Sequence, residues 1–220
     1  MITASPSLTD ALFVLAHRPD GRRIIQGKVL RIGLGGAALL DLIVRGHASV
    51  IDGEVAAVLT GPVPSGLIGD LDRQIRAEPA RRSAKHWVKR FRGVDLSDRV
   101  ADEAAARGFV SSMTTVSLGL FAVVRHVPTA RARDEIVTRV SEVLTGHRDP
   151  DDWDSALVAL CRATRLVKKA FPGTTKARIE AVTGGGETAD AVRKVIAQAN
   201  AAVNNAIIAT VNANNGSQGF

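Results

Sequence analysis

The part of the sequence most suited to binding chemistry is a short segment dense in lysine and arginine. Lys85, Lys89 and Arg92 stand three or four residues apart, so a helix would place them on one face. Trp87 and Phe91 fall between these cations. Basic groups that meet phosphates, beside aromatic rings at the bilayer interface, suit an anionic lipid surface. The alternative is an ordinary solvated helix face whose aromatic side chains turn into the core.

Patterns typical of catalysis are weak or missing. Gly33-x-Gly35-x-x-Ala38, followed by Asp52, has the spacing of a dinucleotide-binding fingerprint, but no further strand–helix units follow. We therefore expect no cofactor, and expect these glycines to permit close backbone packing. The histidines lack the spacing of metal ligands, and Cys161 lies in an apolar helical register that is typical of a buried thiol. The sequence predicts a protein that is not an enzyme and has no metal site.

A second hypothesis is a DNA-binding module. A helix, a glycine and a hairpin over residues 95–124 are similar to the second half of a winged helix, and the chain is basic. However, the helix that would read DNA carries Asp98, Asp102 and Glu103, which phosphates would repel. Nucleic acid is therefore an unlikely partner on sequence grounds. A plain protein-interaction scaffold is the third hypothesis.

Composition bounds these hypotheses. The 220 residues are 45% hydrophobic, with a formal net charge of +7 and a pI near 10.3, which favours an anionic partner. We expect one domain over residues 1–220, with a flexible tail at about 213–220. The N-terminus lacks the pattern of a signal peptide, and no apolar run reaches the ~20 residues that a membrane span needs. We expect a cytoplasmic protein that associates peripherally with the membrane.

The element that must organise the rest is predicted within residues 28–46. A glycine-rich step, Gly33–Gly36, leads into an apolar helix at 37–44 whose one acid is Asp41. An arginine followed by Gly46 is typical of a helix end. A helix that is apolar on nearly all sides is usually surrounded by other helices.

The flanking segments favour a mainly α fold: a single globular helical domain with a buried central helix and peripheral β-hairpins. Strands form local hairpins and do not alternate with helices, which argues against a doubly wound parallel sheet. The expected strands are a short one at 22–25, a hairpin at 47–51 and 54–59 with an Asp52-Gly53 turn, and a hairpin at 109–124 with its tip at 111–115. The expected helices begin at Ser7, at Ser65, at Asp95, after Pro128, at Asp149-Pro150 and at residues 165, 174 and 188.

With these elements placed, the chain resembles the Golgi phosphoprotein 3 family, in its bacterial branch. The first helix matches at Leu8–Leu15, and the most specific block is Gly33–Leu42 with its Arg45-Gly46 ending. Further matches are the Ala105–Gly108 step before a hairpin and the spacing of apolar residues after Asp154. The resemblance implies peripheral attachment to membranes through phosphatidylinositol 4-phosphate, an adaptor role for client proteins, and self-association through the hairpin after Gly108.

The resemblance also identifies where the family's lipid pocket should lie. The tryptophan and three arginines of the eukaryotic pocket correspond here to Gln26, Gly35, Val94 and Ser97, so the pocket residues are largely replaced. We expect nearby cations to supply a substitute headgroup site, namely Arg31, Lys89, Arg90, Arg92 and Arg99. We expect the 109–124 hairpin to enter the bilayer or to form a homo-oligomer through Met113, Leu118 and Phe121.

Overall fold

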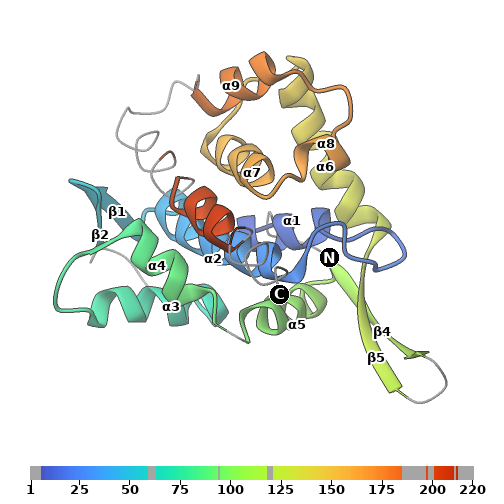
Figure 1. The fold of residues 1–220 in the computed structure, drawn as a ribbon, viewed down its shortest axis with the longest axis horizontal. Coiled ribbons are helices and arrows are strands. Elements are labelled where there is room, and N and C mark those ends of the chain that lie inside the picture. The colour runs from blue at the N-terminus through green and yellow to red at the C-terminus, as the bar shows by residue number, and fades with distance from the viewer. Residues whose placement is uncertain are drawn as a thin grey trace, which may run out of the picture.

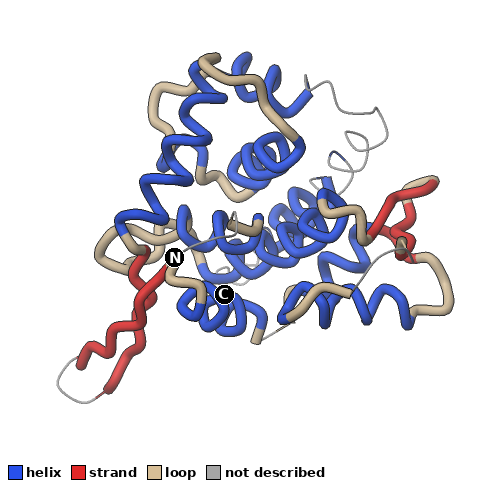
Figure 2. Tube along the Cα trace, turned by 180° about the vertical axis from the view of Figure 1, so that it is seen from behind, coloured by secondary structure: helices blue, strands red, loops and turns tan. Residues whose placement is uncertain are grey.

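Helices dominate the computed structural model, which describes residues 6–58, 63–93, 95–117, 121–184, 197, 201–210 and 212, with the backbone alone at 115–117 and 121–123. The fold is mainly α, as the sequence predicted (Figure 1). Two helices, α1 and α2, form the middle of the molecule. Later helices lie on either side of them, and two small antiparallel sheets lie at the periphery (Figure 2).

The central helix, α2, spans Gly27–Val44 and is buried along most of its length. The predicted glycine-rich step before the helix is wrong, because Gly33, Gly35 and Gly36 lie inside it. A methyl group at Gly33 would come within 2.7 Å of the Thr164 side chain, and one at Gly35 within 2.8 Å of the Val88 carbonyl oxygen. Each glycine costs a helix up to ~1 kcal/mol relative to alanine, and close packing of the neighbours offsets that cost.

Helix α1 (Leu8–Leu15) is tied to the middle of α2 by a buried acid. Ser7 caps α1 through a capping box with Asp10. The carboxylate of Asp41, on α2, accepts hydrogen bonds from the backbone N–H groups of Leu8 at 2.8 Å and Thr9 at 3.1 Å. These donors have no partner within α1, so the α2 side chain completes the start of the neighbouring helix.

The remaining helices cover α1 and α2 from both sides. In Figure 1, α3–α5 lie below the central pair and α6–α9 lie above it. A further helical segment at 201–210 packs on α2, where Val203 lies against Gly36. The bounds are α3 Gly66–Ala77, α4 Ala84–Phe91, α5 Leu96–Ala106, α6 Ala130–Thr145, α7 Asp152–Ala163, α8 Val167–Ala170 and α9 Lys176–Gly184.

Two predicted helix limits need comment. The start of α7 at Asp149-Pro150 is wrong: Asp151 is the N-cap and forms a capping box with Asp154. The last helix was expected from residue 188 to 212, and the structure describes its 201–210 portion, with most of the preceding part and the 213–220 tail outside the described residues.

The first sheet has the strand order β1-β2-β3, with strands Ala48–Ile51, Glu54–Ala57 and Arg82–Ser83. The predicted Asp52-Gly53 turn is confirmed, with φ of 52° and 84° at the two residues, as a hairpin turn with left-handed residues requires. The short strand predicted at 22–25 is wrong. That segment contributes a single bridge, between His17 and Arg23.

The second sheet is a hairpin that projects from the helical body (Figures 1 and 2). Strands β4 (Val110–Ser117) and β5 (Phe121–Pro128) pair from Val110↔Pro128 to Ser117↔Phe121. The predicted tip at 111–115 is therefore wrong, because these residues lie within β4. Residues 118–120, which include Leu118, lie between the two strands and outside the described residues. Met113 stands in mid-strand opposite Arg125 with 51% of its surface exposed. Phe121 opens β5, and its side chain is outside the described part.

Candidate anion-binding site

The aromatic residues of the basic segment belong to the core. Ser83 caps α4, and the helix turns Trp87 and Phe91 inward, leaving them 1% and 3% exposed. The expectation that these rings meet a lipid interface is wrong, and the alternative, a solvated face with buried aromatics, is confirmed. Any contact of α4 with an anionic partner therefore depends on its cations alone.

Arg90 is engaged with the neighbouring helix. Its Nη1 lies 3.2 Å from Glu78 Oε2 and its Nε donates to Gln74 Oε1 at 3.2 Å. The guanidinium also stacks over the Trp87 ring, 5.4 Å from its centre. These contacts connect α4 to α3. Lys89, one residue earlier, is exposed and has no ion-pair partner within the described residues.

Arg99, on α5, forms an ion pair with Asp70 of α3. The hydrogen bond from Arg99 lowers the pKa of the Asp70 carboxyl, so the pair is charged over the whole neutral range. Arg99 and Arg90 thus each hold α3 against a neighbouring helix. Neither of them, nor Lys89, lines the cavity at which Arg31 and Arg92 lie together.

Arg31 and Arg92 do meet, at a cavity of about 340 Å³ that we call the basic cavity. Its described lining consists of Lys28, Arg31, Ile32, Arg92 and Thr210. Among the described residues, no acid lines it, and neither arginine forms an ion pair. A concave surface with positive charge on opposite walls attracts anions more strongly than a flat face with the same charge.

Lys28 was missed by sequence reasoning. With α2 expected to begin at residue 37, its position relative to Arg31 was undefined. The helix in fact begins at Gly27, so Lys28 and Arg31 are three apart on one helix face. The three-residue spacing of Lys28 and Arg31, just before Gly33, is the feature of the sequence that could have revealed Lys28.

Gly35 explains how Arg92 reaches this site. A methyl group at Gly35 would lie 2.8 Å from the Val88 carbonyl oxygen and 3.2 Å from the Arg92 backbone nitrogen. The last turn of α4 therefore rests directly on α2. Arg92, the C-cap of α4, stands beside Gly35, one helical turn from Arg31. An arginine side chain at residue 35, as the resemblance implies for the eukaryotic pocket, has no room in this packing.

The other positions of that pocket are dispersed. Gln26 is the N-cap of α2 and lines a separate cavity of about 270 Å³. Ser97 lines a third cavity, of about 360 Å³, at the base of the β4–β5 hairpin. Val94 lies outside the described residues. Gln26 and Ser97 thus line different cavities.

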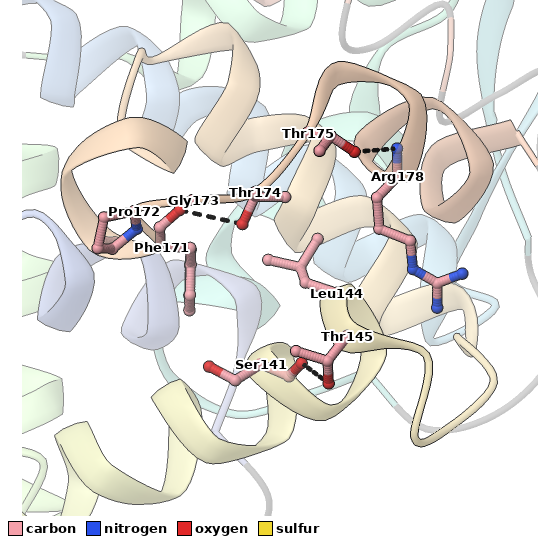
Figure 3. Close-up of a pocket in the computed structure, with 10 residues that line it drawn as sticks. Ser141, Leu144, Thr145, Phe171, Pro172, Gly173, Thr174, Thr175 and Arg178 are labelled. Carbon is pink, nitrogen blue, oxygen red and sulfur yellow. Dashed lines mark hydrogen bonds between the residues drawn. The ribbon is translucent and has the colours of Figure 1, made fainter.

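A cavity of about 380 Å³ between α6 and the α8–α9 connection offers little for an anion (Figure 3). Its hydroxyl groups are used locally: Thr145 donates to the Ser141 carbonyl at 2.8 Å, and Thr174 donates to the Phe171 carbonyl at 3.0 Å. The one cation among its described lining residues, Arg178, donates through Nε to the Val143 carbonyl at 3.0 Å. The Arg178 bond joins α9 to α6.

The remaining candidates from the sequence are a thiol, a metal site, a membrane span and a DNA-binding helix. Cys161 is buried, as predicted, and burial raises the pKa of its thiol to about 12, so it is no nucleophile at neutral pH. Over the described ranges there is no group of three or more potential metal ligands. Likewise, no helix in the described part of the chain has the length and hydropathy to cross a bilayer. On α5, Asp98 and Asp102 point to solvent, which opposes contact of that helix with DNA phosphates.

Comparison with known proteins gives one family. The family model for Golgi phosphoprotein 3 (GPP34) matches residues 8–199 of the chain. No curated protein gives a match. The matched range begins at the first residue of α1 and continues past α9.

Proposed function

Because the chain belongs to the Golgi phosphoprotein 3 family, we propose that it is a non-enzymatic peripheral membrane protein that binds an anionic phospholipid or phosphoinositide headgroup in the basic cavity. The observation that carries the proposal is the convergence of Lys28, Arg31 and Arg92 on one concave surface without a lining acid among the described residues. Phosphatidylinositol 4-phosphate is the headgroup that family membership favours.

The electrostatic free energy that these cations would contribute is adequate for reversible attachment to a membrane. Each cation near an anionic surface contributes about 1 kcal/mol, so Arg31 and Arg92 together would contribute about 2 kcal/mol, or roughly thirtyfold in membrane partitioning. The formal net charge of +7 adds long-range attraction. Both contributions are screened by salt. Attachment should therefore be strong at low ionic strength and readily reversed at high ionic strength.

The replacement of the family pocket is consistent with this site. An arginine carried by α2 at residue 35 is exchanged for glycine, and the closer approach of α4 brings the Arg92 side chain to the same neighbourhood. Arg31 and Lys28 add charge one and two turns earlier on α2. The site would keep its place between α2 and the α4–α5 region while its cations come from different positions.

We test the proposal by co-sedimentation with vesicles of phosphatidylcholine alone, or of phosphatidylcholine mixed with phosphatidylserine or phosphatidylinositol 4-phosphate. Binding should rise with the anionic fraction and fall with salt. The double variant Arg31→Gln/Arg92→Gln should lose about 2 kcal/mol, roughly thirtyfold in partitioning. Equal binding to neutral and anionic vesicles rejects the proposal.

The matched control removes two positive charges elsewhere. Arg131 and Lys168 are exposed, lie on α6 and α8, and do not line the basic cavity. Arg131→Gln/Lys168→Gln has the same net charge as the cavity variant. If both variants lose binding equally, net charge alone causes attachment and the cavity has no special role.

A further inference from the structure

The cavity of about 360 Å³ that Ser97 lines lies where the β4–β5 hairpin joins the helical body. We call it the hairpin-base cavity. The described residues that matter for its chemistry are His17, Arg22, Arg23, Asp98, Arg125 and His126. It has no lining residue in common with the basic cavity. The proposed headgroup site therefore leaves its chemistry unused.

The cavity is positively charged from two directions. Arg23 comes from the α1–α2 connection and Arg125 from β5, and within the described part of the chain neither forms an ion pair. The Arg23 guanidinium lies against Gly27, the first residue of α2, where the helix dipole adds further positive potential. Arg22 is 3.6 Å from Asp20, a weak pair because both side chains are exposed.

His17 supplies a different kind of group. It is 5% exposed, and its Nδ1 lies 2.8 Å from the Phe13 carbonyl oxygen. A carbonyl oxygen can only accept, so Nδ1 carries the proton and the other ring nitrogen, Nε2, presents a lone pair in the neutral ring. Burial, together with the charges of Arg23 and His126, lowers the pKa of His17 and keeps it neutral at pH 7.

Nε2 of His17 is the acceptor that this cavity offers to a ligand. Among the described residues, no group donates a hydrogen bond to it. A bare anion cannot donate, and a ligand without negative charge would leave the charges of Arg23 and Arg125 uncompensated. The cavity therefore suits a molecule that has both a negative charge and a hydrogen-bond donor. Asp98, which also lines the cavity, is a second acceptor.

From this arrangement we infer that the hairpin-base cavity binds a phosphate ester that carries a free hydroxyl, that is, a phosphorylated polyol. The phosphate contacts Arg23 and Arg125, and a hydroxyl donates to Nε2 of His17. Such a group is found in soluble sugar or glycerol phosphates and in polyol-bearing lipid headgroups. Because Arg125 lies on β5 and Arg23 on the body, the ligand would bridge the hairpin to the helices.

The test compares glycerol 3-phosphate with ethyl phosphate by calorimetric titration at pH 7.5, since the two have similar charge and differ in hydroxyl groups. The unmodified protein should bind glycerol 3-phosphate about fivefold to tenfold more tightly, as expected for one additional hydrogen bond. Equal affinities, or no binding of either compound, overturn the inference.

Variants separate the two halves of the site. In His17→Asn the side-chain amide can still donate to the Phe13 carbonyl, but nothing replaces Nε2, so the preference for glycerol 3-phosphate should disappear. Arg23→Gln/Arg125→Gln should weaken the binding of both compounds at least tenfold, because two charge-assisted hydrogen bonds are lost. An unchanged preference in a folded His17→Asn protein contradicts the inference.

A measurement on the unmodified protein does not depend on the folding of any variant. The ¹⁵N resonance of His17 Nε2 should shift on adding glycerol 3-phosphate and stay in place with ethyl phosphate. An unresponsive resonance overturns the assignment of the hydroxyl contact.

The basic cavity and the source of the ligand are tested separately. Arg31→Gln/Arg92→Gln should leave glycerol 3-phosphate binding within twofold of the unmodified protein, whether or not the proposed headgroup site exists. A tenfold loss in that variant would place the ligand in the basic cavity and overturn the inference. Binding to vesicles with phosphatidylglycerol is compared with binding to vesicles with phosphatidic acid. A preference for phosphatidylglycerol that is lost in His17→Asn identifies a lipid source of the ligand. No preference between the two lipids identifies a soluble source.

Discussion

The carboxylate of Asp41 accepts a hydrogen bond of 2.8 Å from the backbone N–H of Leu8, which joins the middle of α2 to the start of α1. Asp41 is fully enclosed, and its nearest cation, Arg45, lies 3.8 Å away with 47% of its side chain exposed. Burial raises the pKa of Asp41 to about 6, and the nearby Asp10 carboxylate adds to the shift. The link between the two central helices is therefore sensitive to pH.

We expect Asp41 to make stability fall as pH rises. A carboxyl whose folded pKa is about 6, against an ordinary value of 3.8, favours the protonated folded state, so its contribution is present below pH 3.8 and lost through pH 6. The size is about 3 kcal/mol, at roughly 1.4 kcal/mol per pH unit. Urea denaturation of the unmodified protein and Asp41→Asn between pH 4 and pH 7 measures it. Parallel pH profiles would contradict the assignment.

Gly35→Ala should destabilise the protein although alanine is the better helix former. The added methyl group meets the Val88 backbone at 2.8 Å, and such overpacking costs about 1–3 kcal/mol, against a helix-propensity gain of at most ~1 kcal/mol. Gly184→Ala, at the end of α9, is the control, because no described residue comes within 4 Å of the added atom. Chemical denaturation compares the two. If Gly35→Ala is as stable as the control, α4 does not rest on α2 as described.

Cys161 should be inert in the folded protein. Its thiol is enclosed by α7 and its neighbours, and a pKa of about 12 leaves almost no thiolate at pH 8. A colorimetric thiol reagent should therefore react slowly in native buffer and stoichiometrically in concentrated urea. Rapid labelling without denaturant would show that α7 opens readily.

The β4–β5 hairpin is the surface on which we propose self-association. Met113 and Val124 are 51% and 56% exposed on adjacent pairs of the ladder, Met113↔Arg125 and Thr114↔Val124. Both strands have an outer edge that no described residue pairs with. Val124→Asp should raise the dimer dissociation constant at least tenfold, measured by sedimentation velocity. Ile208→Asp, at a similarly exposed residue on the 201–210 helix, is the control. A protein that stays monomeric at high concentration rejects the proposal.

Local chemistry made several elements predictable. The Asp52-Gly53 turn, the Ser7 cap and the glycine after α5 each rest on neighbours in sequence, and each is found where expected. Helix α5 also starts next to Asp95, as expected, although the Asp95 side chain makes no capping hydrogen bond. The mainly α class and the buried central helix follow from the apolar content of residues 29–43. In these cases the sequence carries the whole physical cause.

Long-range packing determined what sequence reasoning missed. Gly33, Gly35 and Gly36 look like a loop because glycine is a poor helix former, and only Thr164, Val88 and Val203 explain their place inside α2. The basic cavity depends on which cations are already paired, and the partners of Arg90 and Arg99 lie 12 and 29 residues away in sequence. No local pattern reveals those pairings.

The 201–210 helix contributes to the core and to the basic cavity at the same time. Val203 presses on Gly36 in the centre of the molecule, while Thr210 forms part of the wall that faces Arg31 and Arg92. Truncation before residue 201 would expose α2 at Gly36 and would remove Thr210 from the lining of the basic cavity. The packing of the central helix and the wall of the proposed headgroup site would thereby depend on one segment.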